Sequence, residues 1–115
     1  MTRMLLTWAL TATFAFALTA VGAASSAFAQ DGKTLFNAKG CPTCHGPEGG
    51  KPIGPGYPIT KGQDKTYILN QLKAFKDGNR KGGMADIMAG QLKSTPLTDS
   101  EADIIATYLS SFKKP

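Results

Sequence analysis

Both cysteines and the single histidine of this 115-residue chain lie within five consecutive positions, Cys41-Pro-Thr-Cys44-His45. Thiols and an imidazole are the side chains that most readily ligate metals, bond covalently to cofactors or exchange disulfides. Their concentration in one pentapeptide predicts that the chemistry of the protein takes place there.

Three kinds of site use two cysteines at this spacing. A thioredoxin-like redox pair requires a βαβ setting, and no segment of the sequence alternates as a strand would. A structural zinc ion requires four ligands, whereas the motif supplies three. Covalent haem attachment uses Cys-x-x-Cys-His, because two thiols must reach two vinyl groups and the next histidine then lies under the iron. We therefore interpret Cys41 and Cys44 as attachment sites and His45 as an axial ligand, with a disulfide redox pair or a structural disulfide as alternatives.

An iron held by His45 needs a second axial ligand, and methionine is a common one in electron-carrying haem proteins. Beyond the first 29 residues the chain has two methionines, Met84 and Met88. Residues four apart share a helical face, so the spacing does not choose between them. Either methionine could instead fill the core.

Short helices would position these residues. Residues 31–39 should form the first helix, capped by Asp31 and ended by Gly40, and residues 64–77 the second, capped by Asp64. Residues 84–92 favour a helical turn or irregular structure. The last helix follows a capping box at residues 98–101, and its apolar stripe comprises Ala102, Ile105, Leu109 and Phe112, widened by Ile104 and Tyr108.

Residues 40–58 should form a long loop, because 11 of these 19 residues are Gly or Pro. The fold class is therefore all-α, with long Gly/Pro-rich loops. Only 28 of the 86 residues from 30 to 115 are apolar, which is a small core for a domain of this size. The shortage predicts that something other than protein, such as a haem, fills part of the interior.

The first 29 residues have the three parts of a secretory signal peptide. Arg3 provides a positive start, residues 4–24 are largely apolar, and Ala27-Phe-Ala29 is a small-x-small cleavage site. A retained anchor is the alternative, since the apolar run is long enough to span a bilayer. We expect cleavage, a single domain over residues 30–115 and a periplasmic location, with membrane contact only if the segment is retained.

Residues 30–115 resemble, nearly end to end, the class I c-type cytochromes, and most nearly the single-haem cytochrome c553 and cytochrome c4 group. The matching segments are CPTCHG at 41–46, GPGYPITKGQ at 54–63, YILNQLKAFKDGNR at 67–80 and LTDSEADI…YL at 97–109. The second is similar to that group's A-P-N-F-P-K-L-x-G-Q. The resemblance implies a small cytochrome c fold of about four helices around one covalently bound haem c.

The resemblance also selects a sixth ligand. In this group the ligand methionine tends to stand as Met-x-Gly shortly before the Leu-[Ser/Thr]-Asp start of the last helix. Met88-Ala-Gly90 matches that pattern. Residues 91–96 are about two residues longer than the corresponding family stretch, which keeps Met84 as the alternative.

Further roles follow from the resemblance. Pro55 should offer its carbonyl to the ring N–H of His45, and Ile59 should pack on the haem face. Tyr67 and Gln71 lie one helical turn apart, and Gln71 would either hydrogen-bond near the iron ligand or a propionate, or be a solvated helix position. Leu35 and Phe36 should form a crossing of the first and last helices.

An iron with both axial positions filled by protein has no open position for substrate, so the resemblance implies an electron carrier and not an enzyme. Its partners would be a donor dehydrogenase or quinol-oxidising complex and an acceptor oxidase or reductase. Twelve basic against eight acidic residues in 30–115 could steer acidic partners, whereas no basic run with stacking aromatics indicates nucleic acid. We expect a monomer. The alternatives are a dedicated haem subunit of a periplasmic dehydrogenase complex and a ligand-binding or sensor haem protein.

Overall fold

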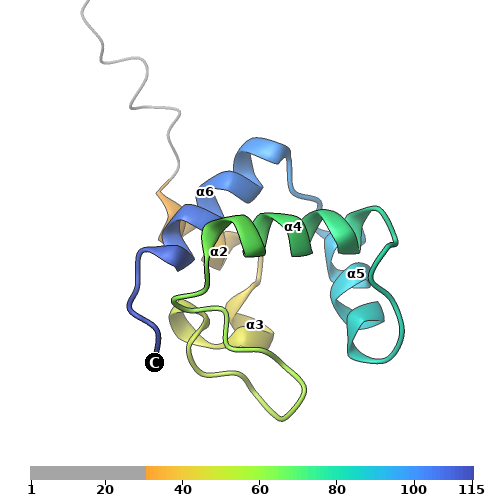
Figure 1. Cartoon of the computed structure of the whole chain (residues 1–115), viewed down its shortest axis with the longest axis horizontal. Helices are drawn as coiled ribbons and strands as arrows, with labels where there is room; N and C mark the ends of the chain where they lie inside the picture. The colour runs from red at the N-terminus through yellow and green to blue at the C-terminus, as the bar shows by residue number, and fades with distance from the viewer. Residues whose placement is uncertain (1–30) are drawn as a thin grey trace, which may run out of the picture.

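The computed structural model describes residues 31–115, and these form short helices joined by long loops (Figure 1). In chain order they are α2 (Gly32–Ala38), α3 (Pro42–His45), the 3-10 turn η1 (Pro47–Gly49), α4 (Lys65–Lys76), α5 (Met84–Ser94) and α6 (Asp99–Ser110). The described part contains no strand, which confirms the all-α class. The expected signal peptide and its cleavage site lie outside the described residues.

Three helical elements differ from expectation. The stretch of residues 40–58 contains α3 and η1, although its glycines and prolines predicted no regular structure. Pro42 opens α3 at a position where a missing N–H costs nothing, so the proline favours this short turn. Residues 31–115 consequently contain five α-helices when the four-residue α3 is counted. Helix α5 is a full helix of 11 residues, where a turn or irregular structure was expected.

Side-chain caps set the starts of α2, α4 and α6, as predicted. A side-chain oxygen of Asp31, Asp64 or Thr98 accepts a hydrogen bond from the backbone N–H three residues ahead. The capping box of α6 is only half formed. The Glu101 carboxylate accepts from the Thr98 hydroxyl at 3.3 Å and pairs with Lys39, with no return bond to the backbone N–H of Thr98.

The protein core lies where α2 crosses α6, next to α4. Its buried apolar side chains are Leu35, Phe36, Ile68, Ile105, Ala106 and Leu109. Gly32 lets the two helices approach closely, because a Cβ at that position would lie 2.4 Å from Cβ of Tyr108. The rings of Phe36 and Tyr108 are 5.8 Å apart. The expected crossing of the first and last helices is confirmed.

Helix α5 is attached differently. It has no buried residue and packs chiefly against α4 (Figure 1). The N-cap residue of α5, Gly83, makes no side-chain capping hydrogen bond. The Asp86 carboxylate instead accepts a hydrogen bond from the backbone N–H of Gly82 at 2.8 Å. Among residues 31–115, no helix combines the length and apolar character needed to cross a bilayer.

Candidate functional site

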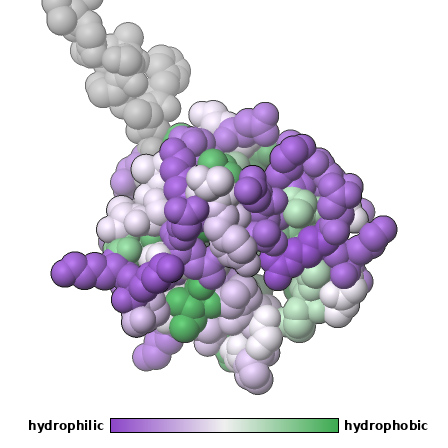
Figure 2. Space-filling view, viewed as in Figure 1, coloured by the Kyte–Doolittle hydropathy of each residue, from purple (hydrophilic) through white to green (hydrophobic). Residues whose placement is uncertain are grey.

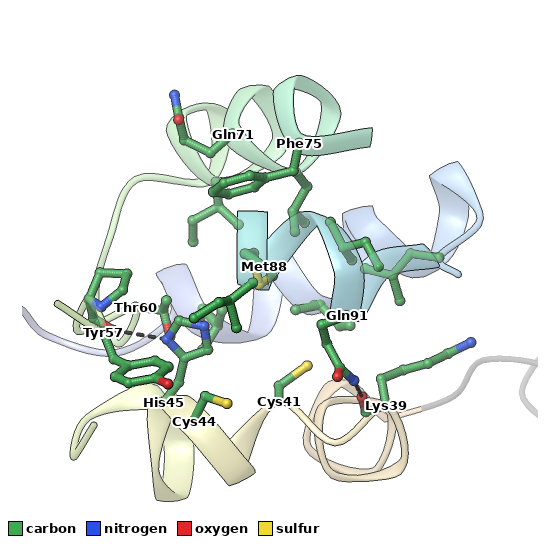
Figure 3. Close-up of a pocket in the computed structure, with 18 of the residues that line it drawn as sticks. Lys39, Cys41, Cys44, His45, Tyr57, Thr60, Gln71, Phe75, Met88 and Gln91 are labelled. Atoms are coloured by element: carbon green, nitrogen blue, oxygen red, sulfur yellow. Dashed lines mark hydrogen bonds between the residues drawn. The ribbon is translucent and has the colours of Figure 1, made fainter. Parts of the chain in front are cut away.

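A largely apolar cavity lies between α3, α4, α5 and the loop that precedes α4 (Figure 3). The motif contributes Cys41, Cys44 and His45. Apolar side chains around them come from four helices and include Phe36, Ile68, Leu72, Phe75, Met84, Ile87, Met88, Leu92, Ile105 and Leu109. Part of the cavity wall is therefore the protein core itself, so whatever fills the cavity extends that core.

The two thiols belong to one helical turn. The backbone N–H of His45 donates to the Cys41 carbonyl at 3.1 Å, which closes the turn and sets both cysteines on the cavity wall. The thiols are not joined in a disulfide. Burial raises the pKa of the Cys41 thiol to about 11. A thiol of that pKa is protonated at neutral pH and a poor nucleophile, which argues against disulfide exchange.

His45 is buried and held by one hydrogen bond. Its Nδ1 donates to the carbonyl oxygen of Pro58 at 2.9 Å (Figure 3), which leaves Nε2 as the ring nitrogen able to ligate a metal. The resemblance assigned this acceptor role to Pro55, and that assignment is wrong. The chain turns at residues 54–57, where the N–H of Tyr57 donates to the Gly54 carbonyl. Pro55 is left exposed in this turn, and Pro58 lies beside the imidazole.

Ile59 was expected to pack on the haem face. Ile59 is 42% exposed and does not line the cavity, whereas its neighbours Pro58 and Thr60 do. Thr60 is turned inward because its backbone N–H donates to the Gly49 carbonyl at 2.8 Å and its hydroxyl donates to the same oxygen at 3.4 Å. The intervening Ile59 is left on the exposed side of the loop.

Both candidate methionines line the cavity, but they do so differently. Met88 is half-buried, and Figure 3 shows it entering the cavity from α5 while His45 enters from α3. Met84 lies at the rim, where it is 38% exposed. A Cβ on Gly56 would lie 3.3 Å from Cγ of Met84, so this methionine rests on the loop backbone. The arrangement favours Met88 as the ligand.

Tyr67 and Gln71 line the cavity from α4, near its rim. Tyr67 is 49% exposed. Figure 3 shows the Gln71 amide pointing away from His45 and Met88, and its Oε1 accepts from Arg80 Nη1 at 2.6 Å. Arg80 was given no role from the sequence. Its guanidinium lies 4.6 Å from the centre of the Phe75 ring. The basic residues of the loop before α5 were the feature of the sequence that could have pointed to this contact.

Comparison with known proteins identifies the group to which the site belongs. Residues 29–113 match the cytochrome c family, so this chain is a member of the cytochrome c family of electron-transfer proteins, which are not enzymes. The family match and the motif define the cofactor as one covalently attached haem c with His/Met-ligated iron. The donor set fits this group, because it provides two thiols without a disulfide, a buried imidazole with one free nitrogen and an apolar cavity.

Several curated relatives are similar to this chain in sequence. Cytochrome c-554(548) of Halomonas halodenitrificans is 41% identical over 71 residues, which cover 62% of this chain and 82% of that protein. Cytochrome c4 of Stutzerimonas stutzeri is 36% identical over 79% of this chain and 43% of its own length. A thiosulfate dehydrogenase electron acceptor of Thiomonas intermedia is 35% identical over 62% of this chain and 31% of its own length. The chain thus spans less than half of the last two relatives.

Proposed function

We propose that this protein is a periplasmic one-electron carrier whose haem c is attached through Cys41 and Cys44 and ligated by His45 and Met88. The observation that carries the proposal is the convergence of α3 and α5 on one apolar cavity. Helix α3 brings the thiols and the imidazole, and α5 brings the thioether. Two axial ligands from the protein leave no open position for a substrate or a gas, which argues against a sensor.

Each residue of the site has a separate task. When bound, haem c supplies a one-electron iron couple. The Pro58 carbonyl fixes the ring tautomer of His45 and strengthens it as a ligand. The Met88 thioether favours the reduced state, since Met/His ligation raises the reduction potential. Apolar side chains from α4 and α5 keep water away, which maintains a low dielectric and limits rearrangement when the charge changes.

The charge distribution supports acidic redox partners. Of the eight carboxylates in residues 31–115, five pair with lysines and three accept from backbone N–H groups. The cations in that part without a carboxylate partner are Lys33, Lys51, Arg80, Lys81, Lys93, Lys113 and Lys114. The face in Figure 2 is mostly hydrophilic, with small apolar areas between polar ones. In this part of the chain, seven cations without a carboxylate partner outnumber the three carboxylates without a cation, and this positive excess favours encounter with negatively charged proteins.

The name of one relative supports the class of donor. The Thiomonas intermedia protein is named as the electron acceptor of thiosulfate dehydrogenase. We therefore favour a periplasmic dehydrogenase or a quinol-oxidising complex as donor and a terminal oxidase or reductase as acceptor, with the carrier monomeric between them.

A second candidate is a dedicated haem subunit of one periplasmic dehydrogenase complex. Two apolar residues of the loop after the motif that do not line the cavity, Ile53 and Ile59, are 64% and 42% exposed, which favours a lasting protein contact there. Purification without detergent from the native periplasm distinguishes a free carrier from a subunit of a complex. A free carrier elutes alone at the size of one chain, and a subunit elutes with its dehydrogenase.

Visible spectra of the purified protein test the ligand assignment. The oxidised wild type should show the methionine–iron band at the red end of the spectrum. We expect Met88→Ala to lose this band and Met84→Ala, the matched control one helical turn away, to retain it. The opposite result, with the band lost only in Met84→Ala, would mean that Met84 is the ligand.

A further inference from the structure

Lys39 binds three separate segments of the fold. It follows α2 and stands two residues before Cys41. Its ammonium donates to the Pro96 carbonyl at 3.0 Å and pairs with Glu101 in the first turn of α6. Its own carbonyl accepts from Gln91 Nε2 at 3.4 Å, a contact drawn in Figure 3 beside the cavity.

These contacts hold both ends of the connection that follows Met88. Gln91 belongs to the last turn of α5, and Pro96 lies in the short connection between α5 and α6, two residues before the cap residue Thr98. In the described part of the chain, the bond from Gln91 to Lys39 is the one side-chain hydrogen bond that links α5 to another helix or its cap. Helix α5 packs chiefly against α4, so this bond is its direct hydrogen-bonded link to the segment that carries Cys41.

The ion pair between Lys39 and Glu101 is partly shielded from water. The side chains of Lys39 and Glu101 are 22% and 25% exposed, so water screens them less than a surface pair. Thr98 in turn fixes Glu101 through two hydrogen bonds. The Thr98 hydroxyl donates to the Glu101 carboxylate, and the Thr98 side-chain oxygen accepts from the Glu101 backbone N–H at 3.1 Å. The hydrogen bond from Lys39 also holds the pKa of Glu101 below its usual range.

We propose that Lys39 is a positioning residue that clamps the α5–α6 connection onto the haem-attachment segment and thereby keeps the Met88 thioether at its ligand position. The inference rests on the proposed ligation by Met88. Without the ammonium, the Pro96 carbonyl and the Glu101 carboxylate lose their shared donor. The bond from Gln91 to the Lys39 backbone carbonyl remains, so the connection between α5 and α6 is then held at its α5 end alone and has more freedom to move. An external ligand should then displace Met88 more easily.

Imidazole binding to the oxidised holoprotein measures this directly. We expect Lys39→Met to bind imidazole about tenfold more tightly than wild type, as for loss of a partly sheltered ion pair and one hydrogen bond. The matched control is Lys93→Met, which makes the same change at an exposed α5 lysine without a carboxylate partner and should bind as wild type does. Lys39→Arg keeps the charge and should retain most of the wild-type resistance to imidazole.

The outcomes are distinguishable. Unchanged imidazole affinity in Lys39→Met, or an equal change in Lys93→Met, overturns the positioning role. If Lys39→Met does not acquire its haem, Glu101→Gln is measured instead, because it removes the carboxylate of the same ion pair. This variant should shift the imidazole affinity in the same direction if Lys39 has the positioning role. Met88→Ala is measured alongside. Retention of its methionine–iron band refutes the underlying ligand assignment, whereas loss of that band with no effect of Lys39→Met refutes only the positioning role.

Discussion

Replacing Gly32 with alanine should push apart the two helices that form the protein core. The new Cβ would lie 2.4 Å from Cβ and 3.1 Å from Cγ of Tyr108, and 3.2 Å from the Ile104 carbonyl oxygen. Carbon atoms in contact stand about 3.5–4.0 Å apart, so α2 and α6 must separate by roughly 1 Å. Both Cβ atoms are fixed to their backbones, and no rotamer change relieves the overlap.

The expected loss can be estimated from this overlap. Overpacking of a core costs about 1–3 kcal/mol, and a small gain in helix propensity offsets part of it. We expect a net loss of about 2 kcal/mol, which lowers the thermal midpoint of a domain this size by roughly 10 °C. The assay is thermal unfolding of the haem-loaded protein followed by far-UV circular dichroism.

Gly90 provides the matched control for this substitution. A Cβ at Gly90 would have no neighbour within 4 Å, and the residue lies in α5. Gly90→Ala should therefore raise the free energy of unfolding by about 0.5–1 kcal/mol through helix propensity alone. If Gly32→Ala melts at or above the wild-type midpoint, the close crossing of α2 and α6 does not exist in the protein.

Two further changes test the helix starts and the loop after the motif. Asp64→Ala removes the bond to the Tyr67 N–H at 3.0 Å and should lower the free energy of unfolding by about 1 kcal/mol, measured by urea titration. Glu48 pairs with Lys61, whose hydrogen bond lowers the pKa of the Glu48 carboxyl. The stabilisation is present above the ordinary carboxyl pKa and is lost as the pH falls through the lower folded value. Urea titrations should therefore show wild type more stable than Glu48→Gln at neutral pH, with the difference vanishing in acid; a difference independent of pH would contradict this pairing.

Local signals in the sequence predicted the helices well. Asp31, Asp64 and Thr98 mark helix starts because a short side-chain oxygen satisfies an N–H three residues ahead, and this requires no tertiary contact. The crossing of α2 and α6 was implied by the family resemblance, and the buried apolar residues of the two helices confirm it. Helix α5 was harder, since its cap residue is Gly83 and its inner face meets the cavity rather than a protein core.

The loop after the motif was where prediction failed. Residues 46–62 have no periodic pattern, so the sequence alone did not show which carbonyl would lie beside His45. The choice of Pro58 over Pro55, and of Thr60 over Ile59, depends on a turn at residues 54–57 and on bonds to Gly49 from a distant part of the loop. Arg80 was missed for the same reason, because its contact with Gln71 joins the helix to the loop that follows it.

The shortage of apolar residues in 30–115 can now be related to the cavity. Six buried apolar side chains make up the protein core, and the cavity beside them is lined by further apolar groups from α4 and α5. A haem attached at α3 would join these two sets into one core. Helix α5 in particular has no buried residue and would depend on the haem for its inner contacts.

The most direct test of this account is the intact mass of the mature protein after acid–acetone extraction, compared with a Cys41→Ala/Cys44→Ala variant. We predict that the wild type retains the mass of one haem and unfolds cooperatively, whereas the variant carries no haem after extraction and has little helix. A wild-type chain of bare polypeptide mass, or a haem-free variant that is fully helical and unfolds cooperatively, would contradict the claim that a covalently bound haem completes the core.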